Sequence, residues 1–72
     1  MAKNLERSVL LDFYGSMLSE KQRRLFTSYY DDDLSLAEIA EEFGISRAAV
    51  HDSLKSAEKS LKEYEEKLGL WL

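Results

Sequence analysis

The 72-residue chain contains no cysteine and no proline, and it has only three glycines. Without cysteine there are no disulfides and no thiolate metal sites, and a reducing cytoplasm is the compartment that we expect. Without proline and with little glycine, helices meet few interruptions. No apolar run approaches the roughly 20 residues of a membrane span, and acids interrupt the apolar start of the chain. We therefore expect neither a membrane span nor a signal peptide.

An excess of positive charge is also lacking. The chain carries 10 lysines and arginines against 14 acids, a net charge of −4, of which −1 falls in residues 1–33 and −3 in residues 34–72. Proteins that bind nucleic acid usually show a basic excess, because contacts to phosphate dominate their affinity. A local basic patch must therefore overcome the field of the whole molecule, or the partner is not a nucleic acid.

Apolar spacing and capping residues predict four helices and an all-α fold. We expect the helices at about 3–18, from the cap Ser19 to the acidic turn 31–33, from the cap Ser35 to Gly44, and at about 47–68. Gln22 and Glu38 lie three residues after Ser19 and Ser35, the spacing of a capping box. We predict a small bundle that forms one domain over 1–72, with a helix-turn-helix core at about 35–57 and a C-terminal helix extension at 58–72.

The first predicted helix is apolar on two sides. One apolar face is predicted from side chains that repeat every four residues, namely Leu5, Val9, Phe13 and Met17, and Leu10 and Tyr14 widen this face. Leu11 and Leu18 lie almost opposite Val9. A helix that is apolar on two sides is either buried on both sides or contacts a partner. We predict packing within the domain together with contact to a second copy.

The last predicted helix has a narrow apolar seam and an apolar end. The seam residues follow alternating steps of four and three: Val50, Leu54, Ala57, Leu61, Tyr64, Leu68 and Trp71. The chain given ends in the sequence LWL, for which three alternatives remain open: it folds back on the core, it contacts a dimer partner, or it packs against a further C-terminal segment. For a homodimer, we predict an interface that contains Leu11, Leu18, Leu68, Leu70 and Trp71.

Five residues have the spacing of a DNA-reading helix-turn-helix. Ala40 is the small residue where two helices cross closely, and Gly44 follows four residues later in a turn that needs a positive φ. Ile45 anchors the turn, and Val50 and Leu54 face inward from the second helix. Together these offsets predict a helix-turn-helix whose second helix begins after Ser46.

The outer side of this second helix carries a basic stripe. Its members recur every three or four residues: Arg47, His51, Lys55, Lys59 and Lys62. Residues 46–62 have a local net charge of +2 in an acidic protein, and a helix N-terminus favours a phosphate near Ser46. The alternative is a solvated helix face whose lysines pair with nearby acids. We favour phosphate contact, because the stripe lies on the predicted reading helix.

The sequence FYGSMLSEKQRRLFTSYYDDDLSLAEIAEEFGISRAAVHDSLKSAEKSLKEYEEKLG resembles the small bacterial YlxM-type helix-turn-helix proteins, the UPF0122 group. It also resembles, more distantly, region 4 of RNA polymerase sigma factors. The most specific parts are YYDDDLSLAEIAEEFGISR and YEEKL. The resemblance implies an all-helical cytoplasmic DNA-binding protein with a link to the signal recognition particle pathway. The chain has Ala48, His51 and Ser53 where the resemblance leads us to expect Gln, Tyr and Asn, the first and last of which read adenine.

These observations lead to two hypotheses of different classes. In the first, a regulatory module binds nucleic acid, DNA in preference to RNA, through Ser46, Arg47, Ala48, His51, Asp52, Lys55 and Lys59. In the second, the same frame is a protein- or RNA-interaction regulator of the signal recognition particle machinery. We expect no catalytic activity, no cofactor and no metal: the acids at 31–33 have calcium-loop spacing, but Leu36 stands where that loop needs glycine. For Arg23 and Arg24, secondary phosphate contacts and ion pairs remain open.

Overall fold

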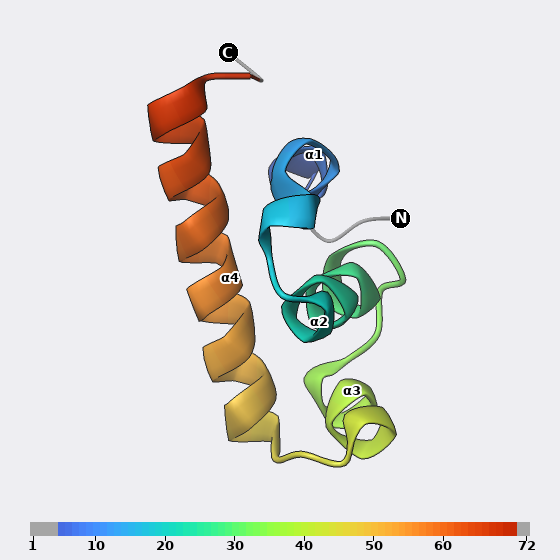
Figure 1. Cartoon of the computed structure of the whole chain (residues 1–72). Helices are drawn as coiled ribbons and strands as arrows, with labels where there is room; N and C mark the ends of the chain where they lie inside the picture. Colours follow the sequence, from blue (N-terminus) through green and yellow to red (C-terminus); the bar gives the residue numbers. More distant parts are fainter. Residues whose placement is uncertain (1–4, 71–72) are drawn as a thin grey trace.

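The computed structural model describes residues 5–70, which form four α-helices and one short 3₁₀ helix with no strand among them (Figure 1). The helices are α1 (Leu5–Tyr14), α2 (Glu20–Tyr30), α3 (Leu36–Phe43) and α4 (Arg47–Leu68), and the 3₁₀ helix η1 (Gly15–Met17) follows α1. The predicted all-α bundle with a long last helix is confirmed. Figure 1 shows α4 running past the other three helices, with α3 beside its first turns and α1 beside its last turns.

Side-chain caps set where the helices begin. The Ser35 hydroxyl accepts from the Glu38 amide at 3.1 Å, and the Glu38 carboxylate accepts from the Ser35 amide at 2.9 Å. This is the predicted capping box of α3. Ser19 caps α2 by accepting from the Gln22 amide at 3.1 Å, whereas the Gln22 side chain accepts from the Ser19 hydroxyl at 3.5 Å. The cap at Ser19 is therefore confirmed, while its reciprocal bond is not formed.

The core lies where α4 meets the other helices. The first four seam residues predicted for α4 are all buried: Val50, Leu54, Ala57 and Leu61. They pack with Leu25 and Phe26 of α2 and with Ile39 of α3, each fully shielded from solvent. The predicted seam is confirmed over these turns, whereas Leu68, at the end of α4, is exposed.

The apolar face predicted for the first helix is only partly buried. Phe13 and Met17 are 45% and 50% exposed, whereas Leu10 and Tyr14 are almost completely buried. In place of the single helix predicted at 3–18, the structure has a shorter α-helix that ends at Tyr14, followed by a 3₁₀ helix. Because a 3₁₀ helix has about 3.0 residues per turn rather than 3.6, Met17 leaves the side that a continuous α-helix would give it.

Tyr14 fixes α1 against the end of α4. Its hydroxyl donates to the Glu65 carboxylate and accepts from the Leu70 amide at 3.0 Å. The Tyr14 ring also packs against the Tyr64 ring, with 6.2 Å between the ring centroids. The Tyr64 hydroxyl in turn donates to the Met17 carbonyl at 3.5 Å. These contacts anchor the C-terminal half of α4 to α1, while its N-terminal half packs against α2 and α3.

Candidate nucleic-acid interface

The turn between α3 and α4 has the geometry predicted from the sequence. Gly44 follows α3 in the left-handed region, with φ +68°, and nothing lies within 4 Å of where its Cβ would be. The Ile45 amide then donates to the Ala40 carbonyl at 3.0 Å. Ala40 is buried, and Ile45 packs against the core. The requirement for glycine therefore comes from the backbone conformation of the turn.

Ser46 places the beginning of α4 at the surface. Its hydroxyl accepts from the Ala49 amide at 3.0 Å, as predicted for the cap. Arg47 and Ala48 occupy the first helical positions, and both are exposed. The first amides of a helix lack intrahelical partners and carry partial positive charge. An exposed cation beside these amides suits an anionic ligand such as phosphate.

All seven predicted nucleic-acid contacts are exposed on this part of the molecule: Ser46, Arg47, Ala48, His51, Asp52, Lys55 and Lys59. Each step of four residues turns the side chain by only about 40° around a helix. His51, Lys55 and Lys59 therefore follow one another along one side of α4. Among the residues that the structure describes, Arg47, Lys55 and Lys59 make no ion pair. The structure thus brings the predicted groups together on one exposed side.

His51 and Asp52 are neighbours that both point into solvent. Their side chains are 55% and 86% exposed, and Nδ1 of His51 lies 3.8 Å from a carboxylate oxygen of Asp52. The two groups form an ion pair only when the imidazole is protonated. At such exposure the pair contributes little to stability, so both side chains are available to an external ligand.

Glu58 separates Lys62 from the rest of the predicted stripe. The Glu58 carboxylate pairs with the Arg7 guanidinium of α1 and lies 3.2 Å from the Lys62 ammonium. Burial opposes ionisation of Glu58, but the hydrogen bonds and charges of Arg7 and Lys62 outweigh it and lower the pKa of this carboxyl. Lys62 therefore shares one carboxylate with Arg7, and the three groups together carry a net charge of +1. Sequence reasoning missed this network, because no local pattern connects Arg7 to a residue 51 positions away.

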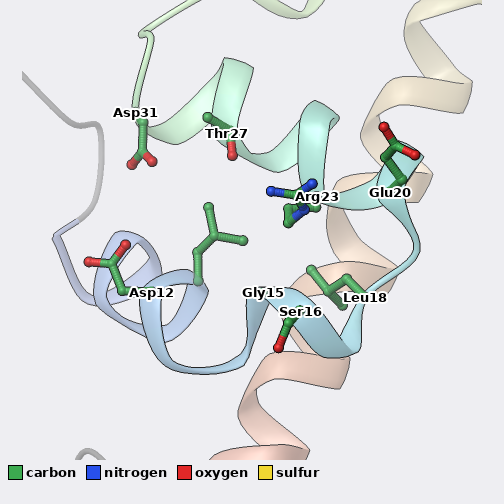
Figure 2. A pocket seen from close by; sticks show the side chains of 9 residues that line it. Asp12, Gly15, Ser16, Leu18, Glu20, Arg23, Thr27 and Asp31 are labelled. Atoms are coloured by element: carbon green, nitrogen blue, oxygen red, sulfur yellow. The ribbon is translucent and has the colours of Figure 1, made fainter.

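Arg23 and Arg24 of α2 do not extend the row of exposed cations on α4. Arg23 lies in a polar hollow between α1, η1 and α2, among Asp12, Glu20 and Asp31 (Figure 2). No residue of α4 lines this hollow. The Arg24 guanidinium lies over the Phe43 ring, 5.2 Å from its centroid, and so links α2 to α3. Three acids line the hollow with Arg23, but none of them forms an ion pair with it among the described residues.

The predicted interface residues separate into buried and exposed groups. Leu11 and Leu18 lie in the core of this chain, so they offer little surface to a partner. Leu68 and Leu70 are exposed. Trp71 lies outside the described residues. The structure adds Phe13 and Met17 to the exposed apolar groups. The hydrogen bonds of Tyr14 and Tyr64 hold the segment that contains Phe13 and Met17 against the end of α4. We call Phe13, Met17, Leu68 and Leu70 the apolar end patch.

The acidic turn at 31–33 connects α2 to α3. Asp31 caps α2 and accepts from the Ser8 hydroxyl at 2.6 Å, and Asp33 adopts a positive φ of 60°. Within residues 5–70, no group of three or more histidine or acidic side chains is arranged to hold a metal ion. No helix in the same range is both long and apolar enough to cross a bilayer.

Comparison with known proteins agrees with this architecture. Residues 1–72 match the family described as "Putative helix-turn-helix protein, YlxM / p13 like", UPF0122. A UPF0122 protein of Halalkalibacterium halodurans is 57% identical over 68 residues, which cover 94% of this chain and 62% of that protein. A UPF0122 protein of Desulforamulus reducens is 56% identical over 63 residues, 88% of this chain and 54% of the relative.

A third relative, the UPF0122 protein of Bacillus cereus strain AH187, is 54% identical over 70 residues, 97% of this chain and 64% of that protein. The chain thus spans between about half and two thirds of the length of these curated relatives. The match extends over every helix described above, including the helix-turn-helix and the long last helix. On these matches and this architecture, the chain belongs to the UPF0122 family of YlxM-like helix-turn-helix proteins.

Proposed function

We propose that this chain binds nucleic acid through the N-terminal half of α4 and acts as a non-enzymatic regulatory module in the cytoplasm. The observation that carries the proposal is the group formed by Arg47, His51, Lys55 and Lys59, which lie exposed on one side of α4 directly after its N-terminus. The helix dipole and the cationic side chains act in the same direction there, so the site attracts phosphate. We call these four residues the basic side of α4.

The unpaired lysines of α4 favour phosphate binding over the alternative of a helix face that is only solvated. Like charges spaced four residues apart weaken a helix slightly, and Lys55 and Lys59 have this spacing. Neither lysine pairs with an acid among the described residues, although Glu63 follows Lys59 by four positions. A stripe that served helix stability alone would pair its lysines, as Lys62 pairs with Glu58. Phosphates would relieve the repulsion between the unpaired lysines.

The same residues support weak and salt-sensitive binding with limited reading of bases. The first turn of α4 presents the methyl groups of Ala48 and Ala49, which make apolar contacts but no hydrogen bonds to base edges. Such groups suit a thymine methyl or the shape of a groove. The net charge of −4 lowers the affinity further, because the rest of the molecule repels the phosphate backbone.

A charge reversal tests the proposal. Arg47→Glu combined with Lys55→Glu should abolish binding to duplex DNA in fluorescence anisotropy while leaving the helical circular dichroism spectrum unchanged. The matched control is Lys67→Glu combined with Lys21→Glu, which makes the same change of charge at exposed positions outside the basic side of α4. Equal losses in both double variants would show that total charge, rather than this site, governs binding.

The first candidate function, nucleic-acid binding, includes a homodimer. A second copy that covers the apolar end patch would join two basic sides in one particle, and two linked weak sites bind more tightly than one. The exposure of the four patch residues favours this arrangement. The second candidate is a regulator of the signal recognition particle machinery, in which the same frame docks on a protein or ribonucleoprotein and its acidic face contacts basic surfaces. Preference for signal recognition particle RNA over duplex DNA distinguishes this candidate from the first.

A further inference from the structure

A second hollow opens directly beside the basic side of α4. It lies where the end of α2, the start of α3 and the middle of α4 meet, and it has a volume of about 180 Å³. Tyr29 and Tyr30 of α2 and Leu36 of α3 line one part of it, and His51 and Lys55 of α4 line another. Two of the predicted phosphate contacts are thus also walls of an aromatic hollow, which we call the tyrosine hollow.

The tyrosine rings have rigid support. The Tyr29 and Tyr30 rings meet edge to face, with their centroids 4.8 Å apart and an interplanar angle of 88°. Behind them the Tyr30 ring packs on Phe26 at a centroid distance of 4.5 Å, and Phe26 is completely buried in the core. Both tyrosines remain partly exposed. Aromatic side chains that are held in place and partly exposed are the platforms on which unpaired bases stack.

The charge around the tyrosine hollow suits a group attached to a phosphate. Its one carboxylate, Glu58, pairs with Arg7 and Lys62, so its negative charge is compensated. Lys55 then supplies positive charge at the wall formed by α4, and the His51 imidazole adds a group that can form hydrogen bonds. The Tyr30 hydroxyl is neutral at physiological pH, as tyrosine ordinarily is, and burial raises its pKa further.

The size of the hollow limits what can enter. Pockets for drug-sized ligands usually measure about 300–1,000 Å³, so about 180 Å³ accommodates a single heterocycle rather than a whole cofactor. We propose that the tyrosine hollow binds one unpaired nucleobase, while Lys55 and His51 bind the adjoining phosphate. A base inside a duplex is stacked on both faces and cannot enter, whereas a bulged or single-stranded base can.

This inference rests on the proposed nucleic-acid binding and adds a preference for unpaired bases to it. RNA and DNA both supply such bases, and the experiment uses both. Fluorescence anisotropy compares three hairpins with the same stem: one fully paired, one with a single bulged adenosine, and one with an abasic bulge. Stacking of one base is worth about 1–3 kcal/mol, and 1.4 kcal/mol corresponds to tenfold in affinity. We expect the bulged adenosine to bind roughly 5- to 140-fold more tightly than the other two hairpins.

Two variants locate the effect in the hollow. Tyr29→Leu removes a ring but keeps an apolar side chain, and Leu36→Trp fills the space from the α3 side. Each should abolish the preference for the bulge and leave the affinity for the paired hairpin unchanged. The control is Tyr64→Leu, another partly buried tyrosine, which does not line this hollow. Leu36→Trp tests the proposal independently if Tyr29→Leu lowers the melting temperature too far.

Each outcome has a defined meaning. A preference for the bulged adenosine in the RNA set, the DNA set or both, lost in the hollow variants alone, supports the inference. Equal binding of wild-type protein to all three hairpins overturns it and leaves the proposed function intact. A preference that survives both hollow variants also overturns it. Absence of binding to any hairpin and to duplex DNA overturns the proposed function itself.

Discussion

The Glu58 carboxylate in the middle of α4 pairs with the Arg7 guanidinium of α1, and the two side chains are only 14% and 19% exposed. This pair joins α1 to α4, and its two residues are 51 positions apart in the sequence. It also compensates the carboxylate of Glu58, which lines the tyrosine hollow beside the basic side of α4. A single ion pair therefore supports both the fold and the charge of the candidate site.

Replacing Glu58 by glutamine should destabilise the fold. Glu58→Gln leaves the mostly buried Arg7 without its anionic partner, and hydrogen bonds to charged groups are worth about 1.5–3 kcal/mol. We expect the free energy of unfolding in urea at pH 7 to fall by about that amount. The control Lys62→Gln removes a more exposed partner and should cost less than about 1 kcal/mol. Equal effects of the two variants would contradict the assigned role of Arg7.

The same pair predicts how stability depends on acid. Because Arg7 and Lys62 lower the pKa of Glu58 in the folded state, its contribution is complete above its unfolded pKa of about 4.3. The contribution is lost as the pH falls through the lower folded pKa. Wild-type protein should therefore lose more stability below pH ~4.3 than Glu58→Gln loses. Parallel pH profiles of the two proteins would contradict this assignment.

Gly44 should tolerate only residues that accept a positive φ. Gly44→Ala places a Cβ in open space, so the expected cost of about 1–2 kcal/mol comes from the left-handed backbone alone. For a domain of this size, 1 kcal/mol lowers the melting temperature by roughly 4–8 °C. Gly44→Asn should cost less, because asparagine adopts this conformation more readily. Thermal melts by circular dichroism measure the difference, and an alanine variant as stable as wild type would be inconsistent with the turn described.

The apolar end patch should control the oligomeric state. Phe13→Ser combined with Leu68→Ser removes two exposed apolar groups and should convert a dimer to a monomer in light scattering after size exclusion. Because both side chains are half exposed, the fold should lose little stability. The Arg47→Glu, Lys55→Glu variant is the control and should retain the dimer mass. A wild-type protein that is already monomeric at high concentration would refute the dimer.

Local interactions explain which structural features the sequence predicts well. The caps Ser19, Ser35 and Ser46 bond to amides three residues away, and Gly44 is required by its own φ. Each of these features is determined within one turn of the chain, so a short stretch of sequence specifies it. The seam of α4 is similar, because its spacing depends on a single uninterrupted helix.

The orientation of α1 and the surroundings of the site depend on distant contacts. Apolar residues cover nearly the whole circumference of α1, so its pattern does not distinguish the side of Phe13 from the side of Leu10. Packing against α2 and α4 makes that choice. The tyrosine hollow forms where three helices meet, and Glu58 acquires its partner from α1. Neither arrangement has a periodic signature in the sequence.

The salt dependence of binding tests the central claim most directly. The affinity for duplex DNA is measured by anisotropy over a series of salt concentrations, for wild-type protein and for Lys55→Gln combined with Lys59→Gln. Each phosphate contact contributes about −0.9 to the slope of log K against log salt. Loss of two lysines should therefore make the slope shallower by about 1.8. An unchanged slope, or no binding of wild-type protein at low salt, would contradict nucleic-acid binding through the basic side of α4.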